Sequence, residues 1–382
     1  MLSEILADIL NLSVTIQQIP APTFHEEGRT AFIQERFLEE GLVDVSVDEI
    51  GNVYGCFPGI GNKPPVVVSA HTDTVFPLSI NLKSSFDETR IFGPGIGDNS
   101  VGVASLLGLI WCLKERSAER GKLHKSGYSD LSGDVWFIAN VGEEGLGDLR
   151  GMRAVIDHFG SNPCAYIVLE GMALGQVYHR GLGVKRYRIT AKTQGGHSWV
   201  DFGRPSAINE IAKFIDHLIS IPVPERPRTT LNVGVIRGGT SVNTIAPEAS
   251  IELDLRSESK QILSKLAAQV EMLVKTFKRP GVGFSYELIG NRPVGEISPD
   301  HPLIRLAKQS LKDVGIEPCL NIGSTDANIP LSLGLPAVCL GLTTGGAAHT
   351  IDEYINTEPL EQGIKQLISV VEGMLIEIAA DT

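Results

Sequence analysis

The order of predicted strands and helices changes twice along this chain, and this change restricts the fold more than any other feature. Up to about residue 182, apolar strand-like runs alternate with amphipathic helices, a pattern typical of a sheet covered by helices. Between residues 183 and 293 the order becomes strand, helix, strand, strand, helix, strand, which is the βαββαβ order of a ferredoxin-like unit. From residue 294 the first pattern resumes. The sequence therefore predicts a compact unit inserted into a larger α/β domain with a mixed sheet.

The length of the chain agrees with two domains, because one hydrophobic core stops growing near ~250 to 300 residues and this chain has 382. We expect residues 1–182 and 294–382 to form one domain and residues 183–293 to form the other. The predicted strands are 43–47, 52–57, 66–70, 134–141, 164–169, 184–193, 230–237, 248–256 and 282–289. The predicted helices are 27–40, 100–115, 148–158, 205–219, 259–277 and 358–379, and the polar segment 116–133 is expected to be an exposed excursion.

The composition disfavours several classes of partner. A formal net charge of −12 argues against nucleic-acid binding, which needs a basic surface to displace counterions from phosphates. No apolar run approaches the roughly 20 residues of a membrane-spanning helix, and the opening segment 1–12 begins with acidic residues, unlike a signal peptide. We therefore expect a cytoplasmic protein with no nucleic-acid or membrane partner. The five cysteines are scattered in apolar contexts, which predicts buried reduced thiols rather than disulfides.

Histidines and acidic residues recur where predicted strands or connecting segments end. They are His71 and Asp73 after VVVSA, Asp98 in FGPGIGDN, Glu143 and Glu144 after VWFIANVG, Glu170 at the end of AYIVLE, and His349 in TTGGAAHTIDEY. In open α/β sheets, ligands bind beyond the carboxyl ends of the strands. The sequence therefore predicts that these side chains form one site.

Each of these residues has an ordinary explanation when it is considered singly. A histidine at a strand end is usually a satisfied polar residue, and Glu143 and Glu144 could simply favour a helix N-terminus. Together, however, so many carboxylates at close range would repel one another unless one or two divalent cations lay between them. Carboxylate and imidazole ligands suit zinc, and also manganese or cobalt. Asp98, in a glycine-rich loop, is expected to bridge two ions, and Asp73 to hold His71 in one tautomer.

Five segments resemble the signature regions of a known enzyme family. SAHTDTV, GPGIGDNSVGVA, NVGEEG, VLEG and GGAAHTIDEY are similar, in order, to those of the co-catalytic zinc peptidases and amidohydrolases. That family includes glutamate carboxypeptidase, succinyl-diaminopimelate desuccinylase, acetylornithine deacetylase and peptidase T. The resemblance implies that one metal ion is held by His71 and Glu170, that the other is held by Glu144 and His349, and that Asp98 bridges them.

The resemblance also implies that Glu143 is the general base, which takes a proton from the bridging water and passes it to the leaving nitrogen. Adjacent residues that leave a strand point in different directions, so one carboxylate can face metal while its neighbour faces water. The sequence alone does not fix which of Glu143 and Glu144 has which role.

The inserted unit carries a second set of candidate residues. His197 lies in the glycine-flanked segment TQGGHSWVD, Asn243 in GGTSVNTIAPEA, and Arg292 in LIGNRPVGE. The resemblance implies that His197 reaches the active site of a partner subunit and polarises the scissile carbonyl, which implies a homodimer. It implies that Asn243 and Arg292 hold substrate, since a guanidinium suits a free carboxylate. The ordinary alternatives are a turn histidine, a loop amide and a surface arginine.

Several other signals are weaker. Ser324 and Thr325, in GSTDANIPLSLGLP, resemble a segment that lines the substrate pocket, although either could cap a helix. The neighbouring His25, Glu26 and Glu27 offer metal-binding atoms, but the spacing of Thr23 and Glu26 predicts a capping box that opens the following helix. The glycines of GPGIGD do not have the dinucleotide-binding spacing. No G-x-S-x-G segment indicates a serine hydrolase.

We therefore expect a metal-dependent hydrolase that cleaves an amide bond in a short peptide or N-acyl amino acid. The attacking group is expected to be a metal-bound hydroxide, Glu143 the base, and residues 183–293 a lid and dimerisation domain. Aminopeptidases of the resembled family tend to have aspartate at the position that matches Glu170, so the resemblance implies a deacylase or carboxypeptidase rather than an aminopeptidase. The alternative from another class is a catalytically silent relative that binds a peptide-like ligand or partner through the same cleft.

Overall fold

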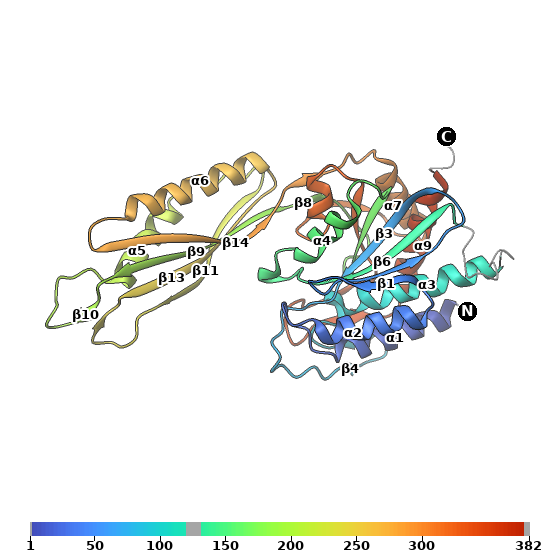
Figure 1. The fold of residues 1–382 in the computed structure, drawn as a ribbon, viewed down its shortest axis with the longest axis horizontal. Coiled ribbons are helices and arrows are strands. Elements are labelled where there is room, and N and C mark those ends of the chain that lie inside the picture. Colours follow the sequence, from blue (N-terminus) through green and yellow to red (C-terminus); the bar gives the residue numbers. More distant parts are fainter. Residues whose placement is uncertain (1, 120–130, 378–382) are drawn as a thin grey trace. The chain divides into compact units, whose positions relative to one another are not determined.

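The computed structural model describes residues 2–119 and 131–377, and it divides into two compact units. The larger unit comprises Met1–Gly181 and Gly295–Thr382, and the inserted unit comprises Leu182–Val294 (Figure 1). Each unit has its own hydrophobic core.

A mixed sheet forms the centre of the larger unit, as the sequence predicted. Among the described residues it has nine strands in the order β1-β2-β6-β3-β7-β17-β8-β15, with β16 also paired to β8. The strands are β1 (Val43–Val47), β2 (Val53–Phe57), β3 (Lys63–His71), β6 (Gly133–Asn140), β7 (Ala165–Glu170), β8 (Gln176–Gly181), β15 (Gly295–Glu296), β16 (Cys319–Gly323) and β17 (Ala337–Gly341). The neighbours β6, β3, β7 and β17 are parallel, whereas β1, β2, β8 and β15 add antiparallel pairs. The carboxyl ends of the central strands therefore meet at one edge.

Helices cover both faces of this sheet. They are α1 (Leu2–Gln17), α2 (Glu27–Glu39), α3 (Val101–Glu119), α4 (Arg150–Phe159), α7 (Pro302–Asp313), α8 (Asn328–Ser332) and α9 (Leu360–Glu377). Val66 and Val68 of β3 pack in one core with α1, α3 and α9, whereas Val67 packs in a separate core with α4 and α8. Successive side chains of a strand point to opposite faces, so the apolar run before His71 supplies both cores at once.

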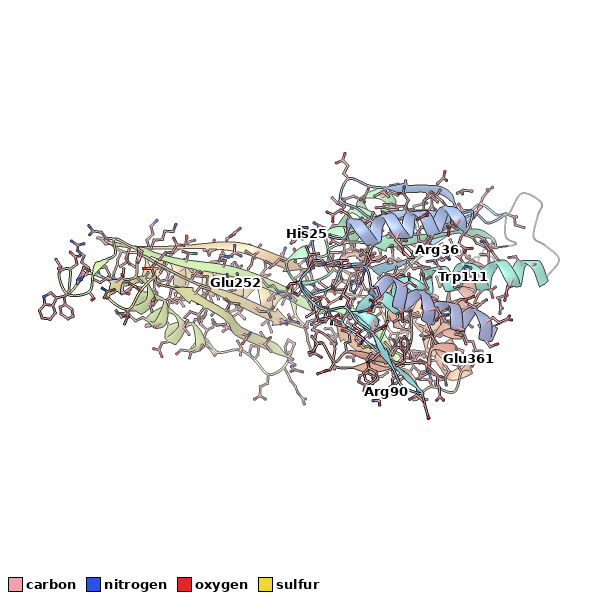
Figure 2. The ribbon with its side chains drawn as sticks, turned by 90° about the horizontal axis from the view of Figure 1, so that it is seen from below. His25, Arg36, Arg90, Trp111, Glu252 and Glu361 are labelled. Atoms are coloured by element: carbon pink, nitrogen blue, oxygen red, sulfur yellow. The ribbon has the colours of Figure 1, made fainter. Side chains whose placement is uncertain are left out.

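A small second sheet joins two distant segments of the chain. It has the order β18-β19-β5-β4, from β4 (Ser85–Phe86), β5 (Arg90–Phe92), β18 (Gly345–Gly346) and β19 (Tyr354–Asn356). The guanidinium of Arg90, which is labelled in Figure 2, lies 4.9 Å from the ring centre of Phe92 and 5.5 Å from that of Tyr354. The pairing of β19 with β5 brings the segment that contains His349 next to the loop that contains Asp98.

The inserted unit has the predicted βαββαβ order. Its elements are β9 (Gly183–Thr193), α5 (Ala207–Ile219), β11 (Thr229–Gly238), β13 (Glu248–Ser257), α6 (Lys260–Phe277) and β14 (Val282–Arg292), with a short pair β10 (Gly196–His197) and β12 (Thr244–Ile245). The sheet order is β11-β13-β9-β14, so β11 and β14 are its edges. Helices α5 and α6 lie on one face of this sheet (Figure 1). Their residues pack with alternate strand residues in one core. The other residues of these strands point to the opposite face and form ion pairs, including that of Arg188 with Glu252. Glu252 is labelled in Figure 2.

Three expectations about local structure were wrong in part. The helix predicted at 100–115 continues to Glu119, and residues 120–130 of the predicted excursion lie outside the described residues. No continuous apolar run reaches membrane-spanning length, but the described segment Ile96–Ala118 (23 residues) is long enough and, on average, apolar enough to cross a membrane. Of its most apolar window, 89% is buried inside the structure, as in a core helix. Cys56, Cys112 and Cys339 are buried, but Cys319 is exposed.

Candidate active site

Three neighbouring parallel strands deliver the first candidate residues to one edge of the sheet. His71 is the last residue of β3, Glu170 is the last residue of β7, and Glu143 and Glu144 follow the end of β6. The order β6-β3-β7 places these ends side by side, as expected for ligand-binding residues in α/β sheets.

The imidazole of His71 is buried and held in one tautomer. Its Nδ1 lies 3.1 Å from the backbone carbonyl oxygen of Asp73, which can only accept a hydrogen bond, so Nδ1 carries the proton. Its Nε2 lies 3.1 Å from Asp98 Oδ1 and 3.8 Å from Glu170 Oε2. His71 thus directs one nitrogen at two carboxylates.

Asp98 faces two different histidines with its two oxygens. Oδ1 faces His71, whereas Oδ2 lies 3.0 Å from His349 Nε2. The backbone around Asp98 needs glycine, since Gly95 has φ +76° and a Cβ on Gly97 would come within 2.4 Å of Met172 Sδ. The direction of the two Asp98 oxygens toward two different histidines is what a carboxylate that bridges two cations requires.

Glu144 completes the second group. Its Oε1 lies 3.1 Å from His349 Nε2, and His349 has a positive φ of 63° that turns the imidazole toward the carboxylates. Two sets of side chains therefore have donor atoms that all lie within 4.8 Å of one another: His71, Asp98 and Glu170 in one, and Asp98, Glu144 and His349 in the other.

The electrostatics of both groups indicate a need for positive charge. Burial raises the pKa of Glu170 to about 7. Hydrogen bonds to Asp98 and Glu144 raise the pKa of His349 to about 10. Burial by itself would lower the pKa of His71, but hydrogen bonds to Asp73, Asp98 and Glu170 outweigh burial and raise it well above its ordinary value. Carboxylate oxygens and imidazole nitrogens with these spacings fit divalent cations.

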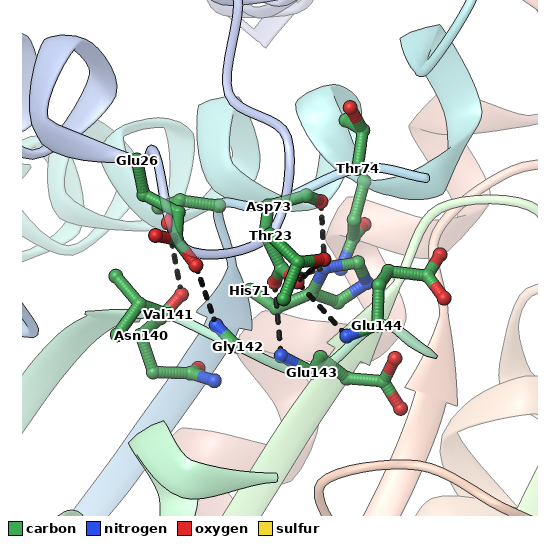
Figure 3. A network of polar contacts seen from close by, with 12 residues as sticks. Thr23, Glu26, His71, Asp73, Thr74, Asn140, Val141, Gly142, Glu143 and Glu144 are labelled. Atoms are coloured by element: carbon green, nitrogen blue, oxygen red, sulfur yellow. Dashed lines mark hydrogen bonds and ion pairs between the residues drawn. The ribbon is translucent and has the colours of Figure 1, made fainter. Parts of the chain in front are cut away.

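Asp73 organises the turn that follows β6. Its Oδ1 and Oδ2 accept hydrogen bonds from the backbone N–H groups of Glu143 and Glu144, each at 2.9 Å (Figure 3). Its Oδ1 also lies 3.5 Å from His71 Nδ1. Burial by itself would raise the pKa of Asp73, but the hydrogen bond and charge attraction of His71, with the hydrogen bonds from the Glu144 backbone and Thr23, outweigh burial and lower it. Asp73 is therefore an ionised anchor between His71 and the two glutamates.

Glu143 and Glu144 differ in whether their carboxylates belong to a group of potential metal ligands. Both residues are buried, at 6% and 7% exposure. Among the described residues, Glu144 belongs to one of the two groups of potential metal ligands, whereas Glu143 belongs to neither. The geometry thus separates two glutamates that the sequence left equivalent.

Ser324 and Thr325 lie in the turn before α8. The Oγ1 of Thr325 accepts a hydrogen bond from the backbone N–H of Ala327 at 3.3 Å and so stabilises this turn. The N-cap residue of α8 is Ala327, which makes no side-chain capping hydrogen bond, so the alternative of a helix cap by Ser324 or Thr325 was wrong. The following Asp326 is fully buried and accepts a hydrogen bond from Asn140 Nδ2 at 2.6 Å. This contact ties the turn to the end of β6.

The inserted unit contains three candidate residues, His197, Asn243 and Arg292. His197 and Asn243 lie on paired segments, because β10 pairs with β12 and the backbone N–H of Ser198 donates to Asn243 O at 3.0 Å. The Nδ1 of His197 accepts from the backbone N–H of Trp199 at 3.2 Å, so the proton of a neutral imidazole is on Nε2. Arg292 is 4% exposed, so the interpretation as a surface arginine was wrong.

The predicted capping box at Thr23 and Glu26 was also wrong. The N-cap residue Glu26 makes no side-chain capping hydrogen bond. Thr23 Oγ1 instead donates to Asp73 Oδ2 at 2.8 Å, and Glu26 binds other partners. The neighbouring His25 is exposed (Figure 2) and is in neither group of potential ligands that the described residues form.

Two buried residues near the site were not found by the sequence reasoning. Glu353 is fully buried, and its Oε1 accepts from the backbone N–H groups of Gly97 and Asp98 at 2.8 and 2.9 Å. Burial raises the pKa of Glu353 to about 7. Arg29 is 1% exposed and its Nη1 donates to Thr72 O at 2.8 Å. The available signal was the position of Glu353 four residues after His349, in the segment that had already been selected.

One known protein family matches most of this chain. Residues 67–373 match the family model described as peptidase family M20/M25/M40. The chain belongs to this family. The match confirms the family that the five segments indicated, and the M20 protein is therefore a hydrolase of the peptidase class.

Individual relatives of this M20 chain are distant. A probable carboxypeptidase of Aspergillus clavatus is 26% identical over 302 residues, which cover 68% of each protein. A tripeptidase from Staphylococcus aureus has the same fold, with a TM-score of 0.76 and 22% identity over 97% of this chain and 99% of that chain. A Bacillus subtilis protein described as a dinuclear metal-binding peptidase of family M20 has a TM-score of 0.70 and 17% identity over 98% and 99%. These structures confirm the mixed-sheet fold.

Proposed function

We propose that this protein hydrolyses an amide bond in short peptides or N-acyl amino acids and that it uses two divalent metal ions, with zinc the best match to the ligands. The observation that carries the proposal is that the two oxygens of Asp98 face two different histidines, at 3.1 and 3.0 Å. A carboxylate so placed between two groups of donors suits two ions. The dinuclear centre described for the Bacillus subtilis relative is consistent with it.

Each ion would be held by one group of donors. The residues proposed as ligands are His71 and Glu170 for one ion, Glu144 and His349 for the other, and Asp98 for both. Two bound divalent ions would polarise the carbonyl oxygen of the substrate and lower the pKa of a water bound to them. The Nδ1–H of His71 donates a hydrogen bond to the backbone carbonyl oxygen of Asp73, so Nε2 is the nitrogen that could bind a metal ion.

Glu143 is proposed as the general base. It is held on the same turn as Glu144 by the carboxylate of Asp73, and it is in neither group of potential ligands among the described residues. Its carboxylate would take a proton from the attacking water and deliver it to the leaving nitrogen. For His197, a proton on Nε2 provides a donor for the carbonyl oxygen of the substrate.

The substrate class is proposed as peptides or N-acyl amino acids with a free carboxylate. Arg292 is the candidate that would bind this carboxylate, because a guanidinium offers two parallel donors. Glutamate at position 170 and the carboxypeptidase name of the Aspergillus clavatus relative both favour a carboxypeptidase or deacylase over an aminopeptidase.

The test of this function is a substrate panel with controlled metal content. After chelation the protein should be inactive, and zinc, cobalt or manganese should restore release of free amino acid from short peptides or N-acyl amino acids. Blocking the carboxylate of a good substrate should reduce turnover more than blocking its amino group. Two bound ions per chain without turnover of any substrate would instead support a catalytically silent binding protein.

A homodimer with a shared active site is proposed as the functional form. Strands β11 and β14 are the edges of the inserted sheet, and edge strands offer pairing surfaces. An inactive His197→Ala chain mixed with an inactive Glu143→Ala chain should regain partial activity, because a mixed dimer then has one site with both wild-type groups. Continued inactivity despite measured subunit exchange, or full activity in a strict monomer, would contradict the role of His197 in a partner site.

A further inference from the structure

The turn after β6 is held by two carboxylates. Asp73 binds the backbone N–H groups of Glu143 and Glu144. Beside it, Glu26 Oε1 accepts a hydrogen bond from the backbone N–H of Gly142 at 3.1 Å (Figure 3). Three successive N–H groups of the turn that carries Glu143 and Glu144 therefore end on carboxylates.

Glu26 is fixed in this position by a charged partner. It is 3% exposed, and its two oxygens lie 3.0 and 2.9 Å from Arg150 Nη2. The guanidinium of Arg150 also lies 4.6 Å from the ring centre of Phe24. Gly142 has φ +67°, and a Cβ there would meet the Arg150 side chain at 2.6 Å. The backbone of the turn is thus packed directly against the pair that Glu26 and Arg150 form.

The segment that contains Glu26 also contacts the other loop of the site. Thr23 Oγ1 donates to Asp73 Oδ2, and Arg29 Nη1 donates to the carbonyl oxygen of Thr72, both at 2.8 Å. Residues 23–29 therefore connect the loop that follows His71 with the turn that carries Glu144. His71, which precedes the first of these loops, and Glu144, which lies in the turn, belong to different groups of potential metal ligands.

We propose that Glu26 is a positioning residue that fixes the turn of residues 141–144 and thereby the directions of Glu143 and Glu144. This proposal rests on the proposed function for its catalytic consequence, but the structural effect on the turn does not depend on it. Hydrogen bonds to an ionised carboxylate are stronger than neutral ones, and removing one partner leaves a buried N–H group unsatisfied. The expected result of removing Glu26 is a turn that samples several conformations.

Three variants of the full chain separate this role from general stability. Glu26→Ala removes the acceptor of Gly142 N–H, and Glu26→Gln keeps an acceptor oxygen but loses the charge that binds Arg150. Glu27→Ala is the matched control, because Glu27 is exposed and lies next to Glu26 at the start of α2, so it removes the same charge from the same helix end. All three are compared at a temperature well below their thermal midpoints.

Amide hydrogen exchange measures the turn without any metal or substrate. Glu26→Ala should accelerate exchange in the peptide that covers residues 141–146 roughly tenfold or more, the size expected for losing a charge-assisted hydrogen bond. Glu26→Gln should show a smaller change and Glu27→Ala none. Unchanged exchange in Glu26→Ala would overturn the proposal.

Cobalt binding and turnover measure the consequence for the site. Glu26→Ala should weaken cobalt binding at the weaker site, or lower kcat at unchanged KM, by about 10-fold to 100-fold, with partial rescue in Glu26→Gln. Equal cobalt affinity and kcat in Glu26→Ala and Glu27→Ala, despite faster exchange, would overturn the positioning role. Failure of the wild-type chain to bind two ions or to turn over would refute the proposed function instead, while the exchange result would still decide whether Glu26 fixes the turn.

Discussion

Replacing Glu143 by alanine is expected to reduce kcat about 100-fold to 10,000-fold, which is the usual contribution of a positioned general base. Metal content should stay at two ions per chain, because Glu143 is in neither of the two ligand groups found among the described residues. The fold should also persist, since the backbone N–H of Glu143, which Asp73 binds, is unchanged by the substitution. The measurements are steady-state kinetics on the best substrate of the panel and metal analysis of the purified variant.

The neighbouring Glu144→Ala variant is the matched control for this experiment. It removes a carboxylate of the same length from the same turn, but one whose Oε1 lies 3.1 Å from His349 Nε2. It should lose one metal ion, and added metal should restore part of its activity. If metal analysis gave the reverse pattern, with metal lost in Glu143→Ala and retained in Glu144→Ala, the two roles would have to be exchanged.

The largest loss of metal is expected from Asp98→Asn. Asp98 is the residue shared by both ligand groups, and an amide offers one oxygen and no negative charge where two carboxylate oxygens face two histidines. Both ions should therefore bind more weakly, so that metal content falls below one ion per chain and activity approaches that of the chelated protein. Metal analysis after dialysis and isothermal titration with zinc would measure the loss.

Two further variants show whether the effect of Asp98→Asn is specific. His349→Ala removes a ligand of one group only, so it should lose one ion and keep the other. Asp216→Asn makes the same chemical change on the exposed side of α5 and should leave metal content and activity unchanged. Retention of two ions per chain by Asp98→Asn would show that Asp98 does not bridge them.

The sequence was a good guide to elements with a local cause. The apolar run at 66–70 predicted a buried strand, and the structure has β3 over Lys63–His71, because such a run satisfies cores on both sheet faces. The βαββαβ order of the inserted unit was equally visible, since its strands alternate and its helices have apolar stripes. The position of His71 at the end of β3 followed directly from these patterns.

The sequence was a poor guide where a side chain had a distant partner. Thr23 and Glu26 have the spacing of a capping box, but they do not bind each other's backbone. Thr23 donates to the ionised Asp73, and Glu26 binds Arg150 and the backbone N–H of Gly142. The position of Glu353 near His349 did not indicate its partners, because these are the backbone N–H groups of Gly97 and Asp98, more than 250 residues earlier in the chain. A local pattern describes what a residue can bind nearby and carries no information on a stronger partner elsewhere.

The sequence by itself determined the class of fold, the family and the set of candidate site residues. For His71, Glu143, Glu144 and Glu170 the physical reason is that parallel strands carry their last residues to a common edge. Only the tertiary structure decided how these residues divide. Asp73 fixes the backbone of the turn after β6, and with that backbone fixed Glu144, not Glu143, lies against His349. The direction of a side chain beyond a strand end depends on the conformation of the turn, and that conformation is set by contacts with residues far away in the chain.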